Sequence, residues 1–173
     1  MIVRRADPAD APALVALAAA VSAEPEGWLI GSGWRSAGDE RRFLRAVRRH
    51  PDAAVFVAEL EGEIAGRMSL ARDPHPASTH VADLGLMVDI RFRRRGIGRA
   101  LLEAAVEWAR EHRVAKLELH VFPWNEPAIG LYESFGFERE GYRKAHYRRE
   151  DGDADAILMA FRVGNHAERQ PLS

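Results

Sequence analysis

The stretch from Val88 to Leu102 carries residue types that could bind an anion. It reads VDIRFRRRGIGRALL, in which a strand pattern ends at a basic turn and a helix pattern begins. The first turn of a helix has free backbone N–H groups and the positive end of the helix dipole, and Gly96 and Gly98 allow close approach of the backbone. The spacing is neither that of a P-loop nor the Rossmann fingerprint. The turn therefore favours a diphosphate-binding site, and the alternative is a solvated basic turn that caps a helix.

A second stretch, residues 117–137, contains an amide and a phenol that could act together. Asn125 and Tyr132 stand seven residues apart, which is two helical turns, so both side chains can contact one ligand. Structural explanations stay open for each of them. Asn125 is a natural N-cap for the helix that follows, and Tyr132 could be a core aromatic residue beside Phe135.

Hydrophobic periodicity predicts the elements that must position these residues. Predicted strands cover 2–4, 53–60, 63–71, 80–88, 116–122, 137–147 and 154–162. Predicted helices follow a cap at 7–10 up to residue 21 and cover 39–50, 98–112 and 125–135. No internal repeat or linker interrupts them. We therefore expect one α+β domain, residues 1–163, and a polar C-terminal tail, residues 164–173.

Composition narrows the class of protein. The chain has 173 residues, of which 47% are hydrophobic and 29% charged, as in a single soluble globular domain. No apolar run reaches the ~18 residues of a membrane-spanning helix, and the charged N-terminal stretch is not a signal-peptide core. We expect a cytoplasmic protein with no membrane partner.

The reactive residue types further narrow the class of protein. The absence of cysteine excludes a disulfide framework and a thiolate nucleophile. The seven histidines are scattered without metal-ligand spacing, so we expect no metal. A net charge of -1 argues against a nucleic-acid partner for the whole chain. The sequence leaves open whether the chain forms a homodimer.

Two motifs in order resemble one known family. The pattern Arg-x-x-Gly-x-Gly spans Arg93 to Gly98, and residues 117–137 read LELHVFPWNEPAIGLYESFGF. Together they resemble the GCN5-related N-acetyltransferase (GNAT) superfamily, and the likeness covers nearly the whole chain. The resemblance implies a mixed, mostly antiparallel central sheet of about seven strands flanked by about four helices. This is the acyl-CoA N-acyltransferase fold.

The resemblance also implies acetyl-CoA as the cofactor and assigns roles to matching residues. The strand edge at 86–88 would pair with the pantetheine arm, the N–H groups of residues 94–99 would hold the diphosphate, and Asn125 would hydrogen-bond the arm. Tyr132 would be the general acid that protonates the departing sulfur. The implied cofactor-binding residues are Leu86, Met87, Val88, Arg93, Arg94, Arg95, Gly96, Ile97, Gly98, Arg99, Asn125 and Tyr132.

The general base is assigned less directly. Many members of the family carry glutamate on the strand before the basic turn, and here the matching residue is Asp83, which is one methylene shorter and would act through water. Period-two alternation puts Asp83 on the face of Met87, opposite Leu86. The alternative is that Asp83 is a surface aspartate or is paired with an arginine. His80 and His120 are other candidate bases.

The implied activity is transfer of an acetyl group to a primary amine by direct attack in a ternary complex. Such folds build the acceptor site from the loop that here holds Trp28 and Trp34, and from the last hairpin, so we expect Trp28, Trp34, His120 and Tyr147 to bind substrate. Aromatic and cationic residues suit a small amine-bearing metabolite or antibiotic. Acetylation of protein N-termini, as in ribosomal-protein acetyltransferases, is the alternative within this class. A non-catalytic domain that binds CoA or RNA through the turn at 91–99 is the alternative outside it.

Overall fold

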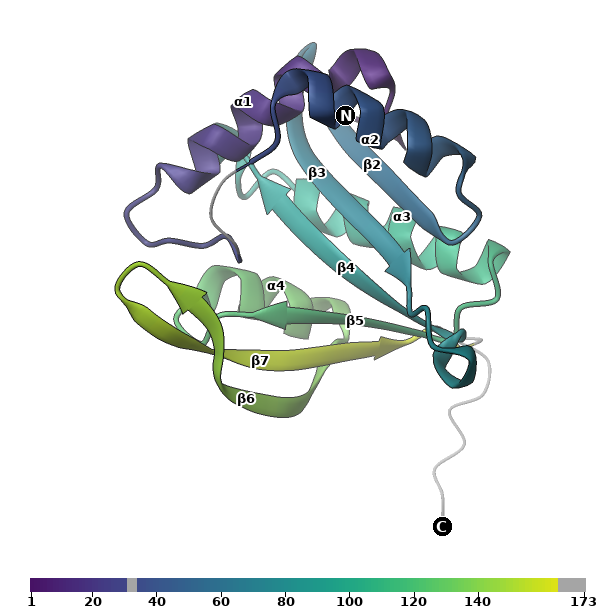
Figure 1. The fold of residues 1–173 in the computed structure, drawn as a ribbon, viewed down its shortest axis with the longest axis vertical. Helices are drawn as coiled ribbons and strands as arrows, with labels where there is room; N and C mark the ends of the chain where they lie inside the picture. Colours follow the sequence, from purple (N-terminus) through teal and green to yellow (C-terminus); the bar gives the residue numbers. More distant parts are fainter. Residues whose placement is uncertain (31–33, 165–173) are drawn as a thin grey trace.

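The computed structural model describes residues 1–30 and 34–164, which form a seven-stranded sheet with helices on both faces (Figure 1). The strand order is β1-β2-β3-β4-β5-β7-β6, and only β4 and β5 pair in parallel. This is the mixed, mostly antiparallel sheet that the sequence predicts. The strands are β1 Ile2–Arg5, β2 Ala53–Leu60, β3 Glu63–Arg72, β4 Val81–Val88, β5 Lys116–Val121, β6 Glu138–Arg149 and β7 Gly152–Arg162.

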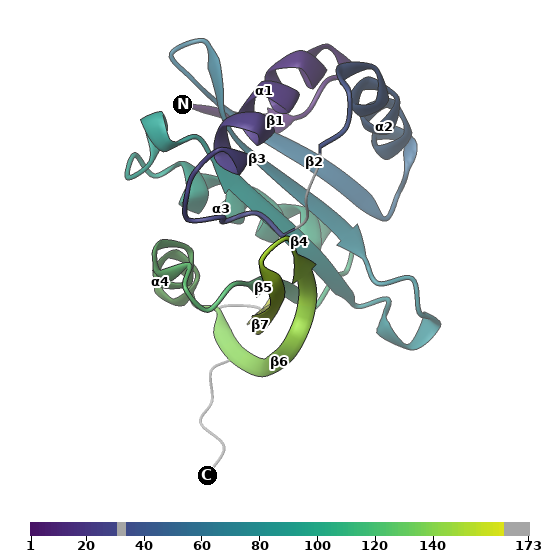
Figure 2. The same ribbon diagram turned by 60° about the vertical axis from the view of Figure 1, so that its left-hand side comes forward.

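Four helices cover the two faces of the sheet. Figure 2 shows α1 and α2 on one face and α3 and α4 on the other. The helices are α1 Ala11–Ser22, α2 Ala37–Arg49, α3 Ile97–Glu111 and α4 Glu126–Phe135, with short 3₁₀ turns at Pro8–Asp10, Pro76–Ser78 and Ile90–Phe92. None of the helices in the described ranges is long and apolar enough to span a membrane.

Each face of the sheet has its own hydrophobic core. On one side the buried stripe of α3, which includes Ile97, Leu101 and Trp108, packs on the sheet as its periodicity predicts. On the other side Leu14 of α1 and Leu44 of α2 contact the opposite face. The sheet therefore separates two compartments, and a ligand that reaches both must pass between strands.

Element ends differ from the sequence predictions by a few residues because caps and turns decide them. Helix α2 begins at Ala37 rather than 39, since the Ser36 side chain caps it by accepting from the Asp39 N–H. The turn of the last hairpin is tighter than the predicted 150–153, because the strands continue to Arg149 and from Gly152. Apart from Gly164, the predicted polar tail lies outside the described residues.

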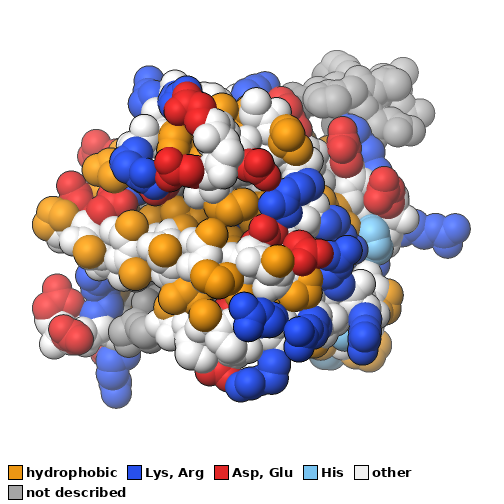
Figure 3. All heavy atoms as spheres, turned by 90° about the horizontal axis from the view of Figure 1, so that it is seen from above, with side chains coloured by type: hydrophobic (Ala, Val, Ile, Leu, Met, Phe, Trp, Pro, Cys, Tyr) orange, Lys and Arg blue, Asp and Glu red, His pale blue; other side chains and the backbone are white. Residues whose placement is uncertain are grey.

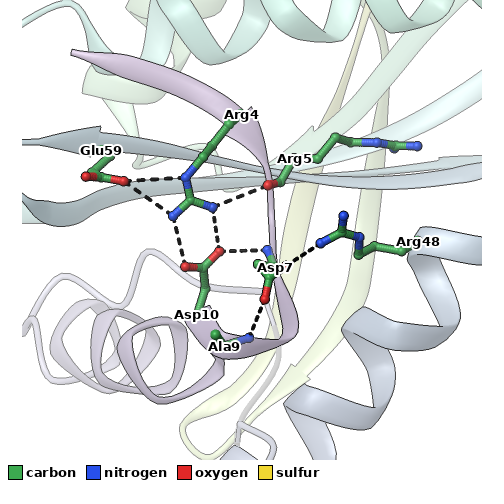
Figure 4. A network of polar contacts seen from close by, with 7 residues as sticks. All are labelled: Arg4, Arg5, Asp7, Ala9, Asp10, Arg48 and Glu59. Atoms are coloured by element: carbon green, nitrogen blue, oxygen red, sulfur yellow. Dashed lines mark hydrogen bonds and ion pairs between the residues drawn. The ribbon is translucent and has the colours of Figure 1, made fainter.

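Polar contacts fix the beginning of the chain against the sheet (Figure 4). Arg4 donates to both oxygens of Asp10, at 2.8 and 2.9 Å, and also to Glu59 of β2 at 3.3 Å. Asp7 accepts from the Ala9 N–H at 2.9 Å and completes a capping box with Asp10. These contacts orient α1, whose C-terminal end leads to the functional cleft.

The outer surface of the layer formed by α1 and α2 carries small hydrophobic side chains and positive charges. Figure 3 shows small hydrophobic side chains running across this face and Lys and Arg side chains gathered along one side of it. Helix α1 exposes the alanines at positions 13, 16, 19 and 20 and buries Leu14, Leu17 and Val21. Its inner stripe alone is therefore responsible for packing.

Candidate active site

The central feature is a parting of two neighbouring strands. β4 and β5 pair only through residues 81–83 and 116–118, although both strands run on for several residues. Beyond Asp83 the edge of β4 that faces β5 has no strand partner, and Figure 1 shows the two strands diverging. The backbone N–H and C=O groups of this free edge can hydrogen-bond a ligand as a strand would.

The parting opens into a cleft of about 1040 Å³. Its lining includes Ser69 and Met87 from the face of α1 and α2, and Leu131 and Ile97 from the face of α3 and α4, so the cleft reaches both compartments. Most of the residues predicted for the site lie in its wall, while Arg95, Asp83 and Tyr147 do not. Those in the wall are Trp28, Trp34, Leu86, Met87, Val88, Arg93, Arg94, Gly96, Ile97, Gly98, Arg99, His120, Asn125 and Tyr132.

The turn before α3 presents a row of backbone donors to this cleft. The first backbone hydrogen bond of the helix runs from Ala100 N to Gly96 O at 3.0 Å. Within the described part of the chain, the N–H groups of residues 94–99 donate no hydrogen bond. Arg94 and Gly96 have positive φ angles of 63° and 81°, which turn the chain so that it leads into the helix. Such an array binds an anion without any side-chain charge.

The arginine side chains of the turn contribute less charge than the sequence suggests. Arg93 donates to both carboxylate oxygens of Glu24, at 2.8 and 2.6 Å, so its charge is already compensated. Three others are also paired with carboxylates, whereas Arg94 has no such partner among the described residues. The paired residues are Arg91 with Asp89 and Glu63, Arg95 with Glu61, and Arg99 with Glu103. In this structure the groups of the turn without a hydrogen-bond or carboxylate partner among the described residues are therefore the backbone N–H groups of residues 94–99 and the Arg94 guanidinium.

The two glycines of the turn have different physical roles. A Cβ on Gly96 would meet nothing within 4 Å, so its positive φ is the reason for glycine there. A Cβ on Gly98 would lie 2.6 Å from Cδ2 of Leu131 in α4. Gly98 thus allows α3 to approach α4, which is a packing requirement that sequence analysis attributed to the anion.

Helix α4 brings the amide and the phenol to the cleft. Asn125 accepts from the Ala128 N–H at 3.3 Å, so it is the N-cap of α4 as well as part of the cleft wall. Tyr132 is 6% exposed and its ring packs near Phe137, with 5.6 Å between the centroids. Its hydroxyl forms no hydrogen bond within residues 1–30 and 34–164, and burial raises its pKa well above the usual value. The phenol is therefore protonated at neutral pH and free to donate.

Titratable residues gather on the face of β4 and β5 that lies opposite α3. Burial and the neighbouring Glu118 raise the pKa of Asp83 to about 6, although solvent reaches one side of the carboxyl and screens this effect. His120 Nδ1 lies 2.5 Å from the Tyr147 hydroxyl. Burial and Arg143 lower the pKa of His120, so its imidazole is neutral at pH 7 and can accept a proton. Burial and, second to it, the Asp83 carboxylate raise the pKa of Tyr147, so Tyr147 lies near both Asp83 and His120, and His120 lies in the cleft wall.

The remaining candidate base, His80, lies elsewhere. It precedes β4, and its carbonyl accepts from the Ala115 and Lys116 N–H groups at 2.7 and 3.1 Å. This is the end of β4 where the strands are still paired, away from their parting. His80 is therefore excluded from the site by its position.

Residues 23–30, which we call the strap, are held at both sides of the cleft. On the side of the α3 turn, Glu24 accepts from Arg93 and also from Trp28 Nε1 at 2.8 Å. On the other side, Trp124 Nε1 donates to Glu26 O at 3.0 Å and Arg149 donates to Gly27 O at 3.0 Å. The strap places the Trp28 ring in the cleft wall, as expected for a substrate-binding residue.

Sequence reasoning missed a buried charged group in the cleft wall. Arg67 of β3 is 5% exposed, and Glu40 of α2 is fully buried beside it, with Arg67 Nη2 3.7 Å from Glu40 Oε1. Arg35 donates to the other oxygen of Glu40 at 3.1 Å. The available signal was an arginine in the middle of a predicted strand, but nothing local relates it to residue 40.

Comparison with known proteins gives a consistent result. Residues 17–137 match the family model described as "Acetyltransferase (GNAT) family". An L-amino acid N-acetyltransferase of Escherichia coli (strain K12) is 37% identical over 111 residues, which cover 64% of this chain and 68% of the relative. The crystal structure of a ribosomal-protein-alanine N-acetyltransferase from Brucella melitensis is 29% identical, covers 94% of this chain and 99% of that one, and superimposes with a TM-score of 0.84.

A further solved structure resembles this chain in fold. An acetyltransferase from Salmonella typhimurium, solved with its cofactor acetyl-CoA, has a TM-score of 0.84 at 20% identity, over 99% of each chain.

Proposed function

This chain belongs to the GNAT family and is an acetyl-CoA-dependent N-acetyltransferase, and we propose that its acceptor is the primary amine of a small metabolite that also carries a negative charge. One observation carries the proposal. The cleft runs between β4 and β5 from the backbone N–H groups of the α3 turn to a region with arginines and tryptophans in its wall. A donor and an acceptor can therefore meet at the parting of the strands from opposite faces of the sheet.

The residues present fit acetyl-CoA. The free N–H groups of residues 94–99 suit its diphosphate, and the unpaired edge of β4 at Leu86–Val88 suits the amide-containing arm. Arg94 adds the one guanidinium of the turn that has no carboxylate partner among the described residues. When bound, acetyl-CoA supplies the acetyl group as a thioester. The backbone N–H of Val88 faces the free edge and would stabilise negative charge that develops on the thioester oxygen, whereas the N–H of Met87 faces β3.

Tyr132 supplies a proton in this proposal. Its hydroxyl is protonated at neutral pH, lies at the wall of the cleft and has no hydrogen-bond partner in the described part of the chain. A thiolate leaving group with a pKa near 8.5 gains from a proton donor at that position. Asn125, two turns away on the same helix, orients the same ligand.

The acceptor amine must lose a proton before it attacks. An alkyl amine has a pKa near 10.4, so about one molecule in a thousand is neutral at pH 7, a difference of roughly 4 kcal/mol. The neutral imidazole of His120 lies in the cleft wall and can take up the proton at pH 7. Asp83, with a pKa of about 6, lies outside the wall and can take it up through water. We assign the base to Asp83 and a substrate-binding role to His120 and Tyr147.

Two features favour a small acceptor over a protein N-terminus. The strap is hydrogen-bonded on both sides of the cleft, which narrows the path for a peptide chain. The pocket beneath it has Arg35 and Arg67 in its wall, which suit a compact anionic group rather than a neutral peptide. The amino acid acetyltransferase among the relatives acts on acceptors of this kind, whereas the Brucella enzyme acts on a ribosomal protein.

An acceptor screen tests the proposal. Thiol release from acetyl-CoA would be measured with amino acids, polyamines, aminoglycosides and N-terminal peptides, each against a blank without acceptor. We expect turnover with small anionic amines. Turnover with N-terminal peptides alone would replace the small-acceptor proposal with protein acetylation.

A further inference from the structure

A group of three charges at the acceptor end of the cleft has two positive members and one negative member. Two guanidinium groups, those of Arg35 and Arg67, share the single carboxylate of Glu40. Arg67 is 5% exposed and Glu40 fully buried, whereas the Arg35 side chain is 43% exposed, so the Arg67 charge is the one that solvent compensates least. Burial and the nearby Arg35 lower the pKa of Arg67, which is the expected sign for a cation with incomplete compensation.

The same group contains polar atoms without partners. Among the described residues, the buried Nε of Arg67 and Nε1 of Trp34 have no hydrogen-bond acceptor, and Oε1 of Glu40 has no donor. The Arg67 guanidinium lies over the Trp34 ring, 5.0 Å from its centroid, so the two free donors belong to neighbouring groups. Buried donors in a folded protein almost always have an acceptor. An anion bound here would accept hydrogen bonds from Arg67 Nε and Trp34 Nε1 and would balance the excess positive charge.

The position of this group relates it to the reaction. Arg67, Trp34 and Arg35 all lie in the cleft wall. Arg67 pairs in register with Met87 of β4, so it lies one strand away from the free edge of β4 that we assign to the thioester. It stands on the face of α1 and α2, opposite the backbone anion site at α3. An anion bound here therefore belongs to the acceptor and not to the diphosphate of acetyl-CoA.

We propose that Arg67 and Trp34 bind the carboxylate of the acceptor, and that the acceptor is an α-amino acid. The proposal rests on the proposed acetyltransferase function and specifies its substrate class. In an α-amino acid a single carbon separates the amine from the carboxylate, which suits a binding group one strand away from the reacting thioester. Arg35 and Glu40 position the Arg67 side chain, and Arg67 and Trp34 supply the contacts.

Binding of matched ligands tests the proposal without relying on turnover. Isothermal titration calorimetry in the presence of CoA would compare each of a panel of L-amino acids with its own amide, which keeps the amine and the side chain but loses the carboxylate charge. For the preferred amino acid we expect the acid to bind about 10- to 100-fold more tightly than the amide, the range of a charge-assisted hydrogen bond. An acid-to-amide ratio near one across the panel would overturn the proposal.

Three variants test whether Arg67 is responsible for the preference for the acid over the amide. Arg67→Gln should reduce the acid-to-amide ratio to about one while leaving the Kd of acetyl-CoA unchanged. The double variant Glu40→Gln with Arg67→Gln removes both buried charges, so it protects the fold and should show the same loss. Arg72→Gln is the matched control, because Arg72 lies on the same strand but pairs with Asp52 outside the cleft wall. It should keep the ratio.

If Arg67 serves only to hold α2 against β3, Arg67→Gln would lower the melting temperature and leave the ratio unchanged. The proposal would then be wrong. Thiol release separates this failure from failure of the proposed function. Release with simple amines and no preference for acids keeps the acetyltransferase and removes the carboxylate site. Amino-acid binding that depends on Arg67, without thiol release for any amine, keeps the carboxylate site and removes the acetyltransferase function.

Discussion

At the scale of single residues, Tyr132 is where a structural role and a chemical role separate most cleanly. Tyr132→Phe keeps the packing on Phe137 and removes only a hydroxyl that has no partner in the described residues. We expect the free energy of unfolding to change by less than about 1 kcal/mol. Turnover should fall by about 100- to 1000-fold, because the proton is needed in the transition state. Single-turnover transfer alongside a melting curve measures both.

The control for Tyr132→Phe is the leaving group. With a thioester whose thiol has a lower pKa than CoA, the loss should be smaller, since a better leaving group needs less protonation. Wild-type turnover in a stably folded Tyr132→Phe protein would assign the proton to water or to another donor.

The role of Asp83 as the base predicts how kcat/KM depends on pH. As a base it must be ionised, so the kcat/KM for the amine should fall below the pKa of about 6, in addition to the change that comes from protonation of the amine itself. Asp83→Asn should lower kcat/KM by about 100-fold at pH 7 and abolish this additional inflection. Glu118→Gln removes the charge that raises the pKa and should move the inflection to lower pH. An unchanged profile in Asp83→Asn would transfer the role to His120.

The same carboxyl should affect stability with a defined sign. Its folded-state pKa lies above the ordinary value of 3.8, so between pH 4 and 6 the folded state binds more protons than the unfolded state. The contribution of Asp83 to stability is therefore favourable below this window and is lost as the pH rises through about 6. Melting curves of Asp83→Asn should lack this component of the pH dependence.

At the scale of elements, the approach of α3 to α4 depends on Gly98. A methyl group there would lie 2.6 Å from Leu131, so Gly98→Ala should reduce the free energy of unfolding by about 1–3 kcal/mol. Adding Leu131→Ala should restore part of the loss, because it removes the atom that is in the way. Denaturant unfolding of both variants measures the effect. Gly96→Ala is the comparison: it meets no atom within 4 Å, so only its positive φ opposes the substitution.

The strap is a second element whose position depends on one side chain. Glu24→Gln weakens the contacts to Arg93 and Trp28, and we expect a severalfold higher KM for the acceptor and faster proteolysis within residues 23–30. Glu26→Gln is the matched control, since Glu26 contributes its backbone carbonyl to Trp124 and not its carboxylate. Equal effects of the two substitutions would mean that side-chain contacts do not hold the strap.

At the scale of the whole molecule, binding of acetyl-CoA should raise the free energy of unfolding. At 100 times its Kd the ligand should stabilise the folded state by about 2.7 kcal/mol. Thermal melting with acetyl-CoA measures this, and an RNA oligonucleotide at the same concentration should produce no shift. A shift with RNA alone would support the nucleic-acid alternative for the turn at 91–99.

The elements of this molecule were predictable because their signals are local. Alternation along residues 116–121, the buried stripe of Ile97 and Leu101, and Gly136 at the end of α4 each depend on a few neighbouring residues. The position of the turn before α3 and of Tyr132 in the cleft wall was predictable because the motifs that carry them are also local.

Pairings between distant parts of the chain were not predictable. Arg93 and Glu24 are 69 residues apart, and their contact changes the role of an arginine that the motif assigns to an anion. Arg67 meets Glu40 only because β3 and α2 pack together, and the spacing of the two positions in the sequence does not predict this contact. Gly98 meets Leu131 for the same reason. Contacts of this kind depend on how elements pack, and one sequence does not encode that packing in a local pattern.

The short parallel pairing of β4 with β5 has a consequence for how the molecule opens. Strands β1–β4 and strands β5–β7 are two antiparallel units, and among the described residues a short stretch, residues 80–83 with 115–118, connects them by backbone hydrogen bonds. A ligand arm lying along the free edge of β4 would add the missing rungs of the ladder. Amide hydrogen exchange in the two units would then be only partly coupled in the free protein and would become coupled when acetyl-CoA is bound. The substrate would thus act as an interior part of the sheet, on which the cooperativity of the fold depends.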